Sequence, residues 1–134
     1  MFGNKSIAKR VAKAVDPVLR PDETKIASVY LHDPTGSDVL VELVGVPVVR
    51  VVKTWILTLT DQRLLVHEGD PMNAAKSSLL GEADRARVAL LAAEPARSPK
   101  SLVLSIDGDA GHQFDVPLVW RKDAATFADA LRAP

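Results

Sequence analysis

The chain has 134 residues, of which 47% are apolar and 25% are charged, and its 17 basic residues balance 17 acidic ones. This length and apolar content predict one globular domain with its own core, and the zero net charge argues against an electrostatic surface for nucleic acid. The absence of cysteine excludes disulfides, thiolate nucleophiles and cysteine-based metal sites.

No stretch approaches the roughly 18 consecutive apolar residues that a membrane-spanning helix needs. The longest apolar stretch, residues 39–60, is interrupted by Glu42, Pro47, Arg50 and Lys53. The N-terminus lacks the apolar core of a signal peptide. We therefore expect a cytoplasmic protein, with attachment to the inner face of the membrane as the alternative location.

Residues 4–15 are predicted to form an amphipathic helix that ends before Pro17. Five apolar residues share one face: Ile7, Ala8, Val11, Ala14 and Val15. Four basic residues lie on the rest of the helix: Lys5, Lys9, Arg10 and Lys13. The plain interpretation is that the apolar face packs on the domain while the basic residues stay in water. The alternative is a helix that lies on an anionic membrane, so these four residues are candidates for membrane or partner binding.

A β-hairpin over residues 50–67 is the central prediction. Side chains alternate in character through residues 55–60, and a period of two predicts one buried face of a sheet. Polar residues 61–62 interrupt the run as a turn, and residues 64–66 resume it.

Other segments also have strand patterns: 26–31, 76–80, 85–93, 101–107 and 113–117. Turns are expected at Gly81-Glu82 and at Asp107-Gly108, since Asp-Gly favours a tight hairpin turn. The β-branched residues of 39–52 favour strand, and a short helix from Ser37 to Gly45 is the alternative there.

The C-terminal residues 121–132 are predicted to form a second helix. Four apolar residues make a stripe at helical spacing: Trp120, Ala124, Phe127 and Leu131. The order of helix, antiparallel strands and helix predicts a mainly β fold, in which the last helix plugs the open corner of a bent sheet.

The hairpin sequence Leu57-Thr58-Leu59-Thr60-Asp61-Gln62-Arg63-Leu64-Leu65 resembles the LTDRRLL hairpin of the bacterial pleckstrin-homology-like domains, which are related to GRAM domains. Residues 19–23 are similar to the family's L-x-P-x-E motif, and residues 114–117 with 123–131 resemble its last strand and capping helix.

The likeness covers residues 19–132. It implies a bent antiparallel β-sandwich or barrel of about seven strands, capped by a C-terminal helix, and it implies no enzymatic activity. Residues 1–18 would then be an added N-terminal helix and connection, and residues 19–134 the pleckstrin-homology-like domain.

One loop departs from the family. Members that bind phosphoinositides have a basic pocket around the first loop between strands. The corresponding residues 33–38 contain two aspartates and no lysine or arginine. These carboxylates would repel a phosphate group, so we do not expect the usual headgroup site.

No catalytic or metal signature is present. His32, His67 and His112 each lie beside a predicted turn without a ligand partner three or four residues away, so we expect surface or edge positions, with a three-histidine zinc site as the alternative. Residues 107–111 begin like a calcium loop but lack its remaining ligands. Residues 77–78 are serines without a glycine-flanked nucleophile turn.

Charged residues outside the first helix are expected in water. Two carboxylate pairs are assigned to a solvated rim or a helix cap: Asp22 with Glu23 and Glu82 with Asp84. Five basic residues are assigned to solvent-facing positions, or alternatively to a basic patch shared with the N-terminal lysines: Arg50, Lys53, Arg63, Arg85 and Arg87.

We therefore expect a non-catalytic binding or scaffolding domain with no catalytic residues, no cofactor and no metal. Its partner would be a protein, a peptide or a second copy of the chain, bound at a sheet edge or in the groove between the last strand and the terminal helix. The alternative is a peripheral membrane module that binds anionic lipid through its basic N-terminal helix. The aromatic content of 4% argues against a nucleic-acid partner.

Overall fold

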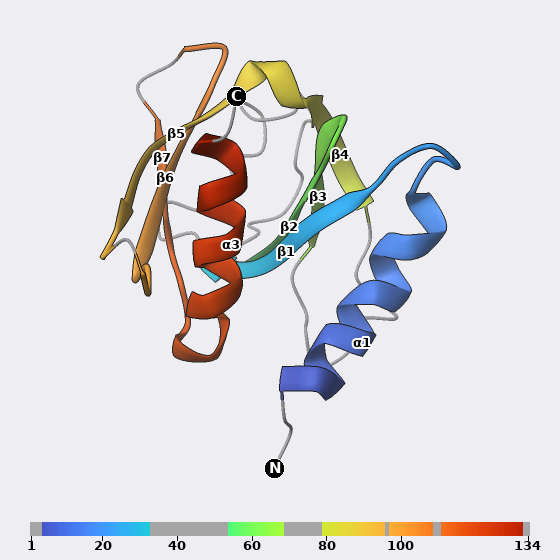
Figure 1. Ribbon diagram of the computed structural model, residues 1–134, viewed down its shortest axis with the longest axis horizontal. Coiled ribbons are helices and arrows are strands. Elements are labelled where there is room, and N and C mark those ends of the chain that lie inside the picture. The colour runs from blue at the N-terminus through green and yellow to red at the C-terminus, as the bar shows by residue number, and fades with distance from the viewer. Residues whose placement is uncertain (1–3, 33–53, 69–78, 96, 109–110, 133–134) are drawn as a thin grey trace.

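The protein, seen in a computed structural model, is built on an antiparallel β-sheet with a helix near each end of the chain (Figure 1). The structure describes residues 4–32, 54–68, 79–95, 97–108 and 111–132. Its strands are β1 (Lys25–His32), β2 (Thr54–Thr60), β3 (Arg63–Glu68), β4 (Leu79–Asp84), β5 (Val88–Glu94), β6 (Ser101–Ile106) and β7 (His112–Asp115). Its helices are α1 (Asn4–Val15) and α3 (Arg121–Arg132), with 3-10 turns η1 (Asp16–Val18), η3 (Arg85–Arg87) and η4 (Leu118–Trp120).

The predicted mainly β architecture is confirmed. Within the described residues, seven strands form one open sheet in the order β4-β3-β2-β1-β7-β6-β5. Both helices have the predicted bounds, 4–15 and 121–132. The predictions for residues 33–53, including the choice between strand and helix for 39–52, lie outside the described residues.

The sheet consists of two parts that diverge from one another. Strands β1 to β4 pair through long ladders, and so do β5 to β7. Between the two parts, the described residues pair only at His32 and Asp115. Helix α3 contacts both β1 and β5, and Figure 1 shows it between the two parts. The terminal helix therefore closes the opening of the sheet, as the sequence predicted.

The interior is one cluster of apolar side chains. Ala124, Phe127 and Ala128 of α3 are fully buried there, together with Leu102 and Phe114 from β6 and β7. The α3 residues recur three or four positions apart, so they share the face that points at the sheet. The predicted apolar stripe is confirmed: Trp120, Ala124 and Phe127 are buried, and Leu131 packs against them.

The prediction that only one face of the central hairpin is buried is wrong. Every residue of β2 after Thr54 is buried, and β3 is buried from Arg63 to His67. Helix α1 provides part of the second cover, because Val11 and Val15 belong to the buried cluster. Figure 1 shows α1 on the side of β1–β4 that faces away from α3. The middle of the hairpin is thus enclosed between packed layers.

Two predicted boundaries are also wrong. Gly81 and Glu82 were expected in a turn but lie within β4. Gly81 pairs with Val66 while Leu79 pairs with His67, so Leu80, beside this glycine, is the extra residue of a bulge. Residues 85–87 were expected in a strand but form η3, the short connection between β4 and β5.

Removal of the Phe127 side chain tests the role of α3 as the cover of the sheet. We expect Phe127→Ala to lower the free energy of unfolding by about 3–5 kcal/mol, since the ring is fully buried. Lys122→Ala on the exposed side of the same helix should change it by less than about 0.5 kcal/mol. Urea titrations followed by circular dichroism measure both. Equal effects of the two substitutions would contradict a packed α3.

Candidate functional site

The two motifs that carry the family resemblance meet at a buried ion pair. Arg63, the first residue of β3, donates from Nε to Oε2 of Glu23 and from Nη2 to Oε1, at 2.8 Å in both cases. The side chain of Glu23 has no solvent exposure, and that of Arg63 is 7% exposed. This two-point contact matches the planar guanidinium to the planar carboxylate.

The turn between β2 and β3 is tied to the same carboxylate. The hydroxyl of Thr60 donates a hydrogen bond to Oε2 of Glu23 at 2.7 Å. The same oxygen accepts hydrogen bonds from the backbone N–H groups of Gln62 and Arg63. Asp61 exchanges two hydrogen bonds with Thr24, one through its side chain at 2.9 Å and one through its backbone at 3.0 Å. The conformation of the turn and its position against residues 20–24 are therefore set together.

Arg63 has two further partners that extend this network. Its Nη1 pairs with Glu82 of β4, and its Nη2 donates to the carbonyl of Val18 at 2.8 Å. The sequence assigned Arg63, Glu23 and Glu82 to solvent, and this was wrong for the first two. One feature of the sequence could have predicted this pair. Glu23 and Arg63 lie in the two motifs, residues 19–23 and 57–65, that carry the family resemblance.

Strong electrostatic coupling follows from this burial. The hydrogen bonds from Arg63 outweigh the effect of burial and lower the pKa of Glu23 to about 2. The same contact raises the pKa of Arg63. Both groups therefore stay charged near neutral pH and direct their charge at each other. This arrangement is typical of a structural pair rather than of an acid or base held ready for catalysis.

His67 is a third residue whose environment was predicted wrongly from the sequence. It was expected at the surface or an edge, but β3 is an inner strand and His67 is 1% exposed. Burial lowers the pKa of the imidazole, and the nearby backbone of Ala14 in α1 offsets this only in part. His32 is exposed, and His112 is half-buried on β7. Among the described residues, no three histidines or carboxylates gather where they would hold a metal ion.

The basic residues of α1 are only partly described. Lys9 and Lys13 are exposed, whereas the side chains of Lys5 and Arg10 lie outside the described part. Because Val11 and Val15 are buried in the protein, α1 is docked on the domain. The apolar side chains of Val11 and Val15 are therefore buried against the domain, and this packing supports the plain interpretation of the described part of the helix.

Arg85 and Arg87 have structural partners. Arg85 donates from Nη2 to the carbonyl of Ala130 at 2.7 Å and so binds the last turn of α3, where the helix dipole favours a cation. Arg87 forms an exposed ion pair with Asp107, 2.8 Å apart. Asp107 and Gly108 both have positive φ angles, as a tight hairpin turn requires.

A groove of about 220 Å³ is the best candidate for a binding site. Seven residues from α1, β1, η4 and α3 line it: Val11, Lys25, Ile26, Ala27, Ser28, Trp120 and Asp123. Burial raises the pKa of Asp123. The Trp120 ring is nearly buried, and its centroid lies 6.3 Å from that of Tyr30. The ammonium of Lys25 is already bound to Asp16 at 3.0 Å.

The sheet edges are less suited to binding than the sequence suggested. Within the described sheet the outer strands are β4 and β5, and both ladders contain a register shift. One shift leaves Leu91 of β5 without a partner position on β6, and this leucine is 53% exposed. Bulges disrupt the regular row of backbone groups to which another strand would pair.

Comparison of the sequence with family models and with curated proteins finds no match. Within the described residues, no helix has both the length and the apolar character needed to cross a membrane.

The buried imidazole of His67 predicts a pH-dependent stability. The pKa of His67 is lowered on folding, so below about pH 6.5 the unfolded chain binds more protons than the folded one. The free energy of unfolding therefore decreases as the pH is lowered through this range. We expect His67→Leu to remove part of this slope between pH 7.5 and 5.5, whereas His32→Gln, at an exposed position, leaves it unchanged. Urea titrations at several pH values measure the slope. An unchanged slope in His67→Leu would contradict this account.

Proposed function

We propose that the protein is a non-catalytic binding or scaffolding domain of the pleckstrin-homology-like type. In this proposal it recognises a protein partner by taking a basic side chain of an extended peptide into the groove lined by Trp120 and Asp123. The observation that carries the proposal is a half-buried carboxylate in a groove with apolar walls. Pockets of this composition bind by apolar contact and use a few polar groups to select the ligand.

The charges around the groove favour a cationic ligand. Within the described residues, Asp123 forms no ion pair, while Lys25 is neutralised by Asp16. A lysine or arginine side chain would place its charge at Asp123 and its methylene stem along Val11 and Trp120. The part of the indole ring that lines the groove adds apolar surface for this stem.

Two observations support binding rather than catalysis. The ionisable groups with the largest shifts, Glu23 and Arg63, neutralise each other within the fold. The groove itself holds a single carboxylate beside an already paired lysine. The one hydroxyl side chain in the lining, that of Ser28, is hydrogen-bonded to the hydroxyl of Thr58 at 2.8 Å rather than to a base, whereas nucleophilic chemistry needs an adjacent base.

The sheet edges give a reason to favour side-chain recognition in the groove over addition of a peptide strand to the sheet. Both outer strands contain a bulge, which disfavours pairing with an extended peptide. The groove differs from the site expected in the sequence, because β1 and α1 form its other walls in place of the last strand.

A charge-selective peptide titration tests the proposal. We expect a capped tetra-arginine peptide to bind the full chain and a capped tetra-glutamate peptide not to bind. Asp123→Asn should weaken binding of the arginine peptide by at least about ten-fold, since a charge-assisted contact is lost. Isothermal titration calorimetry measures each affinity.

Asp129→Asn is the matched control, because Asp129 lies on the same helix but is exposed and paired with Arg132. It should bind the arginine peptide as the wild type does. Thermal unfolding of both variants checks that the fold is kept. Equal loss of affinity in the two variants, or equal binding of the two peptides, would refute recognition in this groove.

A further inference from the structure

We infer that η4 is an insertion point for an anionic membrane surface, with Leu118 and Val119 as the inserting side chains. This inference is independent of the groove and of the proposed peptide ligand. It places membrane contact on the turn before α3, and it does not require α1 to leave the sheet.

The apolar side chains of this turn are unusually exposed. Leu118 is 73% exposed and Val119 is 51% exposed, and Leu118 is the most exposed large apolar residue in the described part of the chain. They are adjacent on one short turn, whereas isolated surface leucines are common and need no explanation. An apolar pair at a projecting turn has the form of a small membrane-inserting tip.

The turn is held in this position by its neighbours. Trp120 is 5% exposed and packs into the core directly after Val119. The backbone N–H of Trp120 donates to the carbonyl of Pro117 at 2.9 Å, and the backbone N–H of Val116 donates to the carbonyl of Lys100 at 2.9 Å. The exposure of Leu118 and Val119 is thus set by anchored residues on both sides of the turn, so insertion would cost little ordering of the chain.

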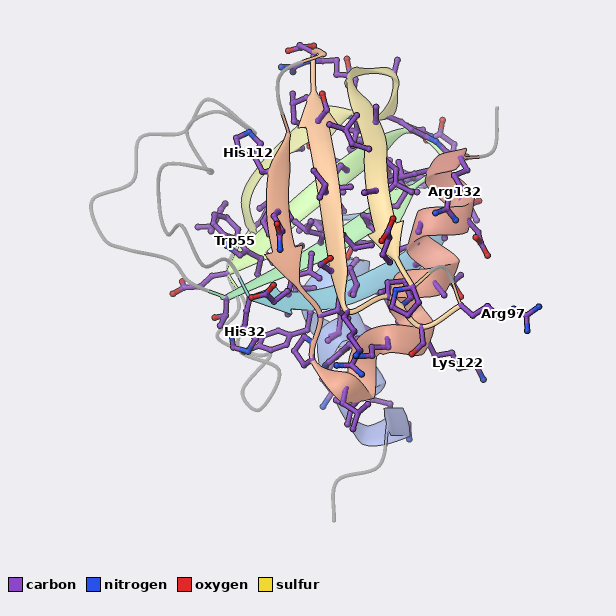
Figure 2. All side chains as sticks on the ribbon, turned by 90° about the vertical axis from the view of Figure 1, so that its left-hand side faces the viewer. His32, Trp55, Arg97, His112, Lys122 and Arg132 are labelled. Carbon is purple, nitrogen blue, oxygen red and sulfur yellow. The ribbon has the colours of Figure 1, made fainter. Side chains whose placement is uncertain are left out.

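Basic residues surround the tip. Arg121 and Lys122 follow it directly, and the hydrogen bond from Val116 to Lys100 brings the connection between β5 and β6 beside it. Figure 2 shows Arg97 of that connection and Lys122 projecting from the same side of the molecule. The β5–β6 connection and the residues on either side of the tip also contain three acidic residues, Glu94, Asp115 and Asp123. Of these, Asp123 lines the groove.

Helix α1 begins at the same end of the molecule and carries exposed lysines along its length. In both views, the N-terminal end of α1 and η4 lie at the lower end. Lys9, midway along α1, is exposed, on a helix whose Val11 and Val15 are buried in the protein. An apolar tip with basic residues around it is complementary to a bilayer that carries anionic headgroups above its acyl chains.

Cosedimentation of the full chain with vesicles tests this inference. We expect binding to phosphatidylcholine vesicles that contain phosphatidylserine, weaker binding as salt rises, and no binding to phosphatidylcholine alone. The double variant Leu118→Ser with Val119→Ser should bind at least about ten-fold more weakly. Replacement of Arg97 and Lys122 by glutamine should cost roughly five-fold for each charge.

Leu91→Ser is the matched control, because Leu91 is also an exposed leucine but lies on the outer strand β5. It should bind vesicles as the wild type does. Three results would overturn the inference. One is that the wild type does not sediment with anionic vesicles. Another is that the tip variant binds like the Leu91 variant. The third is that sedimentation velocity shows a dimer that the tip substitutions dissociate, with no vesicle binding, which would make the tip a contact between copies.

Discussion

The ion pair between Glu23 and Arg63 is the constraint on which the arrangement of the domain depends. A buried charge is costly unless a partner and hydrogen bonds replace the lost water. Here the guanidinium finds the carboxylate of Glu23, the carboxylate of Glu82 and the carbonyl of Val18. These partners come from the segment before β1, from β4 and from η1. The side chain of Arg63 thus links three segments of the chain at the turn end of the central hairpin. The hydroxyl of Thr60 holds the adjacent turn through its bonds to Glu23 and to the backbone of Arg63.

Around this fixed end, two helices complete the core in different ways. Helix α3 occupies the opening between the two parts of the sheet, where the described strands pair only at His32 and Asp115. Helix α1 supplies Val11 and Val15 to the same buried cluster. The candidate groove exists because residues of both helices line it together with residues 25–28 of β1, so it is a consequence of how an open sheet is covered. The exposed turn η4 follows from the same packing, since Trp120 must enter the core directly before α3 begins.

Much of this architecture could be predicted from local patterns. The spacing of Phe127 and its neighbours placed α3, and alternation placed the central hairpin, because both signals depend on residues close in sequence. The buried state of Arg63 and His67 could not be derived in this way, since a charged or polar residue at the end of a strand reads as solvent-exposed until its partners are known. Gly81 was likewise taken for a turn, because a glycine beside a bulge has the same local sequence pattern as a glycine in a turn. The groove was missed because its walls come from both ends of the chain.

A double-mutant cycle on Glu23→Gln and Arg63→Met tests the central claim most directly. The free energy of unfolding is measured by urea denaturation for the wild type, both single variants and the double variant at neutral pH. The account predicts that each single variant loses about 3 kcal/mol or more, because it leaves a buried charge without its partner. It also predicts that the double variant loses clearly less than the sum, with a coupling energy of about 2 kcal/mol or more. Additive losses, with a coupling below about 0.5 kcal/mol, would contradict the role assigned to this pair.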